Sequence, residues 1–224
     1  MIGLVRSFAS ICHPPINPTL PQYIVGYGSL INEQSKKRTD ETAQDNFPVL
    51  VKGYKRTWGV YGDFPGVNAT FLIVLEDPSS SFNGVIYKLI HPNKIQEYDK
   101  RESIYCRQAI NSDQLKQYAG TLPKQKQIWI YSSKQKEIQS PSTQYPIVQS
   151  YVDLFIRGCI EIEEKFHIKH YARNCIITTE HWSSHWVNDR IFPRRPSLFE
   201  PYAAEIDLLL KETLPEQFKQ ISIE

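Results

Sequence analysis

The sequence lacks any marked excess of one charge, and it lacks long apolar runs. Lys and Arg number 26 against 24 Asp and Glu, which gives a formal net charge of +2. Such a balance is not typical of proteins that bind nucleic acid or anionic lipid. Apolar runs such as residues 71–75 are far shorter than the roughly 20 residues that span a bilayer. We therefore expect no membrane helix and no nucleic-acid partner, and a small molecule or another protein as the partner.

Cysteine is also scarce, and its 4 copies form no Cys-x-x-Cys pair. Small disulfide scaffolds are dense in cysteine, and cysteine zinc sites favour closely spaced pairs. We therefore expect a protein of the reducing cytoplasm, without a cysteine zinc site. Residues 1–12 are mildly apolar, but Arg6 interrupts them, and Ile11 stands where processing before Cys12 would need a small residue. We expect neither a signal peptide nor a lipid anchor.

The rest of the composition is that of a folded globular protein. Hydrophobic residues make up 41%, charged residues 22% and aromatic residues 12% of the chain, which suffices to bury a core. A length of 224 residues fits one domain with an elaborated end. We predict a proline-rich extended lead-in at residues 1–21, a folded domain at 22–165, and a helical extension at 166–224 packed on that domain.

Strand signals come first along the chain, and helix signals follow. β-branched and aromatic residues between turn-forming residues predict strands at 23–25, 49–51, 54–61, 69–75, 84–90, 105–110 and 127–131. Apolar residues at three-and-four spacing predict helices at 92–101, 147–162 and 202–214. Strands followed by helices favour the α+β class, and these strands suit a closed or strongly curved sheet.

Two glycines, Gly26 and Gly28, follow the first predicted strand. Glycine can adopt positive φ, so neighbouring backbone N–H groups can converge and bind a carboxylate or an oxyanion. Gly-x-Gly after a strand also occurs in plain turns, and no third glycine completes a dinucleotide-binding fingerprint. The turn is a candidate anion site or an ordinary turn, and it does not indicate a nucleotide.

Glu102 lies where the helix predicted at 92–101 passes into a strand. A carboxyl group at the mouth of a barrel can have its pKa raised by burial and then serve as general base and general acid. The alternative is a surface carboxylate paired with Lys100, Arg101 or Arg107, which is the more common situation for glutamate.

Several short motifs occur in a specific order along the chain. Tyr-Gly-Ser-Leu at 27–30 precedes Gly-Val-Ile-Tyr at 84–87, then comes the stretch 99–102, and then Tyr105-x-Arg107. Ser-Pro-Ser-Thr-Gln-Tyr-Pro at 140–146 stands before an apolar helix. This arrangement resembles the gamma-glutamylcyclotransferase-like family, whose members carry Tyr-Gly-Ser near the start and a catalytic glutamate after a Gly-Val-x-Tyr strand. The resemblance covers residues 22–160.

The resemblance implies an α+β fold, specifically a small mixed β-barrel flanked by helices. It implies an enzyme that releases 5-oxoproline from a γ-glutamyl amide, glutathione being one such donor, without metal or cofactor. Glu102 would be the general acid/base. The residues that would bind the substrate are Tyr27, Gly28, Ser29, Leu30, Tyr105, Tyr131 and Tyr145. Because the resemblance does not reach the extension, we expect that segment to influence which donor enters the pocket.

Two features of the C-terminal third indicate other functions. His181, His185 and Asp189 are spaced like metal ligands on one helix face, as a metal hydrolase would require, although His-Glu-x-x-His is missing. Residues 190–195 combine three arginines with an aromatic residue and a proline. Arginines suit anionic groups, so this segment could serve a non-catalytic binding module. The alternative is a loop held on the domain by local ion pairs.

Overall fold

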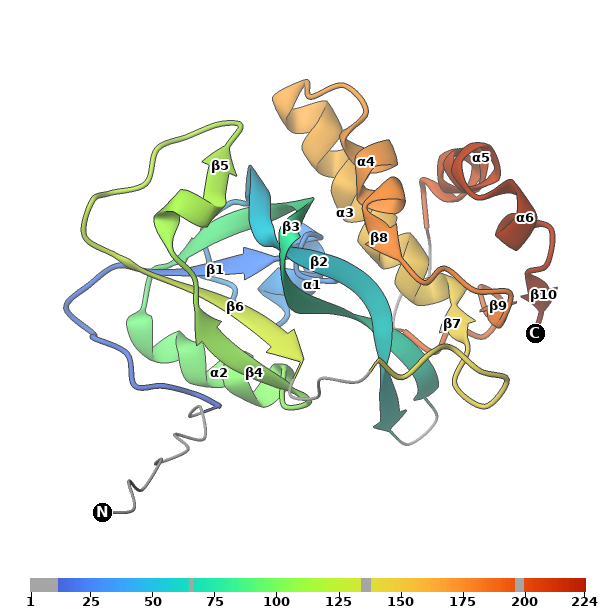
Figure 1. Cartoon of the computed structure of the whole chain (residues 1–224), viewed down its shortest axis with the longest axis horizontal. Helices are drawn as coiled ribbons and strands as arrows, with labels where there is room; N and C mark the ends of the chain where they lie inside the picture. The colour runs from blue at the N-terminus through green and yellow to red at the C-terminus, as the bar shows by residue number, and fades with distance from the viewer. Residues whose placement is uncertain (1–11, 65–66, 134–137, 196–199) are drawn as a thin grey trace, which may run out of the picture.

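The computed structural model describes residues 12–64, 67–133, 138–195 and 200–224, and its main element is a mixed sheet of seven strands (Figure 1). The strand order is β4-β6-β1-β3-β2-β5, and β8 pairs with β2 outside this path. β1 is antiparallel to β3 and parallel to β6. The bounds are β1 Gln22–Gly26, β2 Phe47–Phe64, β3 Val67–Leu89, β4 Tyr105–Ala109, β5 Leu115–Gln117, β6 Gln127–Ser133 and β8 Thr179–Glu180.

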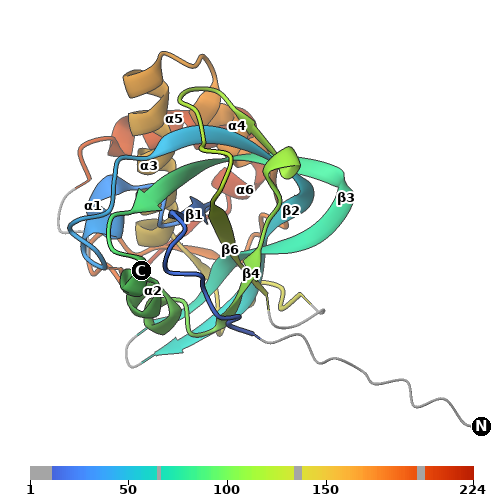
Figure 2. The same ribbon diagram turned by 90° about the vertical axis from the view of Figure 1, so that its left-hand side faces the viewer.

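The sheet is strongly curved but not closed, which corrects the predicted β-barrel (Figure 2). In the part of the chain that the structure describes, β4 pairs with β6 alone and β5 pairs with β2 alone. β5 has only three residues, and further along β2 the strand β8 pairs with Arg56 and Thr57. These two short strands therefore occupy the edge of β2 that β4 would need for closure. The α+β class is confirmed.

β2 and β3 form one long hairpin where we predicted four shorter strands. Tyr54 pairs with Glu76, whereas Lys52 pairs with Ser81, so residues 77–80 lie opposite Gly53 alone. Gly53 has a φ of 79°, which glycine adopts without strain. The glycine and the residues opposite it therefore form a bulge that bends a continuous hairpin, and they do not end a strand.

The helices α3 (Gln149–Phe166) and α4 (Tyr171–Ile177) lie side by side next to the sheet, and α5 (Ala203–Thr213) packs against both (Figure 1). The helices predicted at 147–162 and 202–214 are confirmed as α3 and α5, although Ile147 and Val148 form a short strand before α3 begins. Among the described residues, no helix has the length and apolar character to cross a bilayer. The other elements are α1 Glu33–Lys37, the 3-10 turns Pro92–Lys94 and Ser112–Gln114, α2 Ile95–Arg101, α6 Pro215–Phe218, and a small parallel sheet of β7 Ile147–Val148, β9 Trp186–Asn188 and β10 Ser222–Ile223.

Two disulfides join the four cysteines, although we expected cysteines too sparse for such bridges. Cys12 is bonded to Cys106 on β4, and Cys159 on α3 is bonded to Cys175 on α4. The first pair is 94 residues apart in sequence, a distance that no spacing pattern reveals. The expectation of a reducing compartment rested on cysteines too sparse for a disulfide scaffold, and the observed pairing removes that support.

We expect the α3–α4 disulfide to contribute measurably to stability. This disulfide closes a loop between cysteines that are 16 residues apart in sequence. Removing a crosslink that closes a loop of this size lowers the free energy of unfolding by about 3 kcal/mol. The test is urea unfolding of a Cys12→Ser, Cys106→Ser protein with and without dithiothreitol, because only the helix disulfide can then be reduced. An unchanged unfolding midpoint after verified reduction would contradict this expectation.

Candidate functional site

The topology brings three segments that are distant in sequence to one edge of the sheet. β1 and β6 are parallel, so the turn after Gly26 and the residue Tyr131 lie at the same edge. β4 runs antiparallel to β6, and Tyr105 at its start pairs with Ser133 at the end of β6. The residues just before β4, including Glu102, therefore meet the turn that follows β1.

A cavity of about 150 Å³ lies at this edge. Its described lining is Ser29, Phe71, Arg101, Glu102, Ile104, Tyr105, Tyr151 and Arg195. A smaller hollow of about 20 Å³ adjoins it and shares Ser29, Glu102, Tyr105 and Tyr151. The rest of its lining is Val25, Tyr27, Gly28, Leu30, Leu72 and Tyr131. Glu102 thus belongs to both spaces.

Glu102 is held at the end of α2 with its carboxylate largely shielded from solvent. Its backbone N–H donates to the Tyr98 carbonyl at 2.8 Å, and its carbonyl accepts from the Tyr105 N–H at 2.9 Å. Only 14% of its side chain is exposed. Burial raises the pKa of this carboxyl above its ordinary value, and the nearby guanidinium of Arg101 partly opposes that shift. A carboxyl group with a raised pKa holds its proton at higher pH than an ordinary glutamate, which suits a group that must both accept and return a proton.

Arg101 fixes the position of Glu102 relative to the turn after β1. Its Nε donates to Glu102 Oε1 at 3.0 Å, and its Nη2 donates to Ser29 Oγ at 3.0 Å. Nη1 and Nη2 also donate to the Ser35 carbonyl and the Ser35 hydroxyl, and Nη1 donates to Thr39 Oγ1. The guanidinium is therefore fully engaged and ties α1, the turn and the carboxylate together.

The turn after β1 needs glycine for space. A Cβ on Gly28 would lie 2.8 Å from the Tyr151 hydroxyl oxygen, and one on Gly26 would lie 3.0 Å from a Val85 methyl group. Positive φ is found at Gly53 and Gly120 among the described glycines, so the expected conformational role of Gly26 and Gly28 is wrong. Close packing against α3 and β3 is the physical reason for glycine at these two positions.

Three of the predicted tyrosines form walls of the smaller hollow with their hydroxyls already engaged. Tyr27 donates to the Tyr131 carbonyl at 2.7 Å, Tyr105 donates to the Leu72 carbonyl at 2.9 Å, and Tyr131 donates to Asp99 Oδ1 at 2.7 Å. Burial raises the pKa of each hydroxyl, so all three stay protonated at neutral pH. They hold the shape of the cavity.

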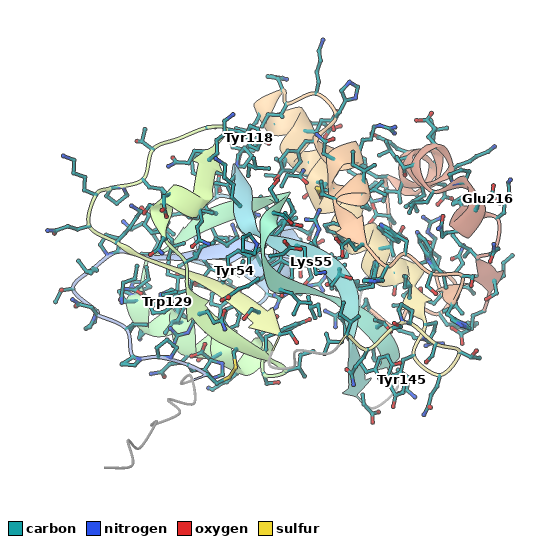
Figure 3. The ribbon with its side chains drawn as sticks, viewed as in Figure 1. Tyr54, Lys55, Tyr118, Trp129, Tyr145 and Glu216 are labelled. Atoms are coloured by element: carbon teal, nitrogen blue, oxygen red, sulfur yellow. A yellow bond between two sulfur atoms is a disulfide. The ribbon has the colours of Figure 1, made fainter. Side chains whose placement is uncertain are left out.

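Tyr145 lies elsewhere, at the outer end of the β2–β3 hairpin (Figure 3). Its ring stacks on Tyr61 with centroids 4.3 Å apart, and its carbonyl accepts from Thr70 Oγ1 at 2.6 Å. Neither space described above has Tyr145 in its lining. The structure therefore brings Glu102, Tyr27, Gly28, Ser29, Leu30, Tyr105 and Tyr131 together and leaves Tyr145 apart.

Sequence reasoning missed Phe71, Tyr151 and Arg195 as lining residues. Phe71 lies in the middle of a strand and Tyr151 on the buried face of α3, so both have the sequence signal of core residues. Burial raises the pKa of Tyr151 to about 12. Arg195 was singled out in sequence only as part of an arginine-rich segment, and nothing local links it to Glu102.

The other two arginines of that segment are used internally, as the ion-pair interpretation predicted. Arg190 donates to both Asp153 on α3 and Asp207 on α5, with distances of 2.7–2.9 Å. Arg194 pairs with Glu224 and donates to the Asn68 carbonyl. These contacts pin the segment onto the domain.

The histidines and Asp189 are not arranged on a helix. His181 and His185 lie between β8 and β9, and their Nδ1 atoms face Thr57 Oγ1 at 2.7 Å and Thr143 Oγ1 at 3.5 Å. Asp189 accepts hydrogen bonds from the Ser150 backbone and hydroxyl. The helical alignment on which the metal hypothesis rested is therefore wrong.

Comparison with known proteins adds a structural relationship. No family model matches this sequence, and no curated protein matches it. A solved structure of gamma-glutamyl cyclotransferase superimposes with a TM-score of 0.51 at 13% identity, covering 66% of this chain and 86% of that one. The chain has the gamma-glutamyl cyclotransferase fold. YkqA from Bacillus subtilis gives a TM-score of 0.48 at 21% identity over 66% of this chain and 53% of that one. The yeast gamma-glutamyl cyclotransferase specific to glutathione gives 0.40 at 13% identity over 70% and 97%.

Proposed function

We propose that this chain is an enzyme that cleaves a γ-glutamyl amide into 5-oxoproline and a free amine or amino acid. The observation that carries the proposal is the buried Glu102 carboxylate, held by Arg101 beside the turn 27–30 in a cavity of the gamma-glutamyl cyclotransferase fold. In this proposal Glu102 is the general acid/base, and the turn residues Tyr27–Leu30 surround the glutamyl group. Tyr105 and Tyr131 shape the pocket, and no cofactor takes part.

The proposed reaction needs few catalytic groups on the protein because the nucleophile belongs to the substrate. Glu102 takes a proton from the α-ammonium group, and the resulting amine attacks the γ-carbonyl carbon to form a five-membered ring. The C–N bond to the leaving group then breaks as the leaving nitrogen takes this proton from Glu102. The attacking nitrogen loses its second excess proton as the ring forms, and this proton ends on the released amine, which leaves as an ammonium ion. No water is consumed. Alignment of an intramolecular reaction supplies up to roughly 7–11 kcal/mol of the barrier reduction.

Turnover of a panel of donors tests this proposal. The panel contains γ-glutamyl dipeptides, glutathione and γ-glutamyl-lysine, and the readout is 5-oxoproline release. The account predicts catalytic release from at least one of these donors. An absence of release from all of them, with protein shown to be folded, would contradict it.

The pH dependence of kcat/KM should report the raised pKa of Glu102. The ionised carboxylate is the form that accepts the ammonium proton, so activity falls as pH drops through the pKa of this group. Because burial raises that pKa, the acid limb should have its midpoint above the ordinary value of 4.5. A pH–rate profile measured with a good donor checks this, and an acid limb at or below 4.5 would contradict it.

A further inference from the structure

The Arg195 guanidinium lines the larger cavity without a carboxylate partner among the described residues. It belongs to the C-terminal extension, whereas Glu102 and Arg101 come from the segment between β3 and β4. Its Nε is buried and has no hydrogen-bond partner in the part of the chain that the structure describes. A buried cationic donor without a partner is costly, so an anionic ligand at this position would satisfy it.

The backbone that carries Arg195 is anchored at the start of α3. The Arg195 N–H donates to Ser150 Oγ at 3.1 Å, and Ser150 Oγ donates to Asp189 Oδ2 at 2.6 Å. The preceding N–H, of Arg194, donates to the same Asp189 oxygen at 2.7 Å. Arg195 therefore enters the cavity from a fixed backbone.

Two aromatic rings orient the guanidinium itself. The guanidinium carbon of Arg195 lies 5.6 Å from the Phe71 ring centre and 6.0 Å from that of Tyr151. Such cation–π contacts stabilise the charge without using its N–H donors. Among the residues that the structure describes, no acceptor for its side-chain N–H groups is found, so the planar fork can bind a carboxylate, which guanidinium holds through two parallel hydrogen bonds. Arg101 cannot play this part, because its donors are engaged by Glu102, Ser29, Ser35 and Thr39.

The arrangement of the two adjoining spaces indicates which part of the substrate Arg195 would contact. Tyr27, Gly28 and Leu30 lie on the side of the smaller hollow, Arg195 lies on the side of the larger cavity, and Glu102 borders both. If the glutamyl group occupies the side of the turn, the leaving group occupies the side of Arg195. This step rests on the proposed function.

We propose that Arg195 determines specificity by binding a carboxylate on the leaving group. The donors favoured would be γ-glutamyl amino acids or peptides with a free carboxylate close to the scissile amide, and γ-glutamyl derivatives of neutral amines would be poor donors.

The test compares γ-glutamyl-alanine with γ-glutamyl-alaninamide, which differ only in the carboxylate. We expect wild-type protein to prefer the acid, and Arg195→Gln to lower kcat/KM for the acid by roughly 10- to 100-fold more than for the amide. The change should lie mainly in KM, and Arg195→Lys should restore part of the preference. Arg194→Gln is the matched control, because Arg194 pairs with Glu224 outside the cavity lining, and it should retain the wild-type preference. An equal loss on both donors, or no loss on either, would overturn the inference.

Binding separates this inference from the proposed reaction. Calorimetric titration of both dipeptides into Glu102→Gln protein, with and without Arg195→Gln, measures the carboxylate preference without turnover. A preference that depends on Arg195 supports the inference even if wild-type protein releases no 5-oxoproline, in which case only the proposed function fails. Turnover without an Arg195-dependent preference would leave the reaction standing and overturn the inference.

Discussion

Replacing Glu102 by glutamine is expected to lower 5-oxoproline release by about 10²- to 10⁴-fold, the range for loss of a positioned general acid/base. Glutamine keeps the shape and can still accept a hydrogen bond from Arg101 Nε, which lies 3.0 Å from Glu102 Oε1. It cannot take the proton from the substrate ammonium or return one to the leaving nitrogen. The loss should therefore be in kcat, measured with the best donor of the panel at saturation.

Glu97→Gln is the matched control for that variant. Glu97 lies on the same helix, α2, with 46% of its side chain exposed, and it pairs with Lys100 at the surface. Its replacement should leave turnover within about twofold of wild type, since such exposed pairs contribute little. Glu102→Gln should unfold no earlier than wild type at neutral pH, because burial disfavours the charge that glutamine removes. Full activity in Glu102→Gln would contradict the proposed role of Glu102 as general acid/base.

Arg56→Met is expected to destabilise the fold by about 3 kcal/mol or more, because several buried acceptors lose their donor at once. Arg56 is fully buried, and its guanidinium donates to the carbonyls of Tyr27, Asn83 and Cys175 at 2.7–3.2 Å. It also donates to the hydroxyls of two threonines after α4. Burial lowers the pKa of this guanidinium to about 9, so it remains charged at pH 7. Arg56 thus links the turn after β1 to β3 and to the end of α4.

Urea unfolding of Arg56→Met measures this effect. The matched control is Arg157→Met on α3, because Arg157 makes an i,i+4 pair with Glu161 near the surface, and its loss should cost at most about 1 kcal/mol. Replacing the buried charge of Arg56 by methionine also removes its desolvation penalty, and this offsets part of the expected destabilisation. A change below about 1 kcal/mol at Arg56 would mean that this offset is complete, and the linking role would be wrong.

Local sequence signals predicted the parts of the site that lie next to each other along the chain. The turn 27–30 follows a strand of β-branched residues, and Glu102 follows a short amphipathic helix, so both positions were predictable. Their meeting at one sheet edge follows from the parallel pairing of β1 with β6, which the sequence pattern alone does not give. The placement of Tyr145 depended on a motif match, and packing on Tyr61 takes it to the hairpin end.

Long-range contacts account for most of what the sequence did not predict. Closure of the sheet depends on which strand pairs with the free edge of β2, and β5 and β8 are too short to have shown a strand signal. The Cys12–Cys106 bridge and the position of Arg195 likewise depend on segments far apart in sequence. An arginine in a polar loop has the sequence signal of a surface residue until packing brings it into a cavity.

The identity of the product tests the central claim most directly. A γ-glutamyl amide can be cleaved by attack of the substrate's own amine, which gives 5-oxoproline, or by attack of water, which gives glutamate. The measurement is the reaction in water labelled with oxygen-18, followed by mass spectrometry of the products from wild-type and Glu102→Gln protein. We predict unlabelled 5-oxoproline in equal amount to the released amine, and its loss in the variant. Labelled glutamate as the first product, or 5-oxoproline formed equally fast by the variant, would contradict the account.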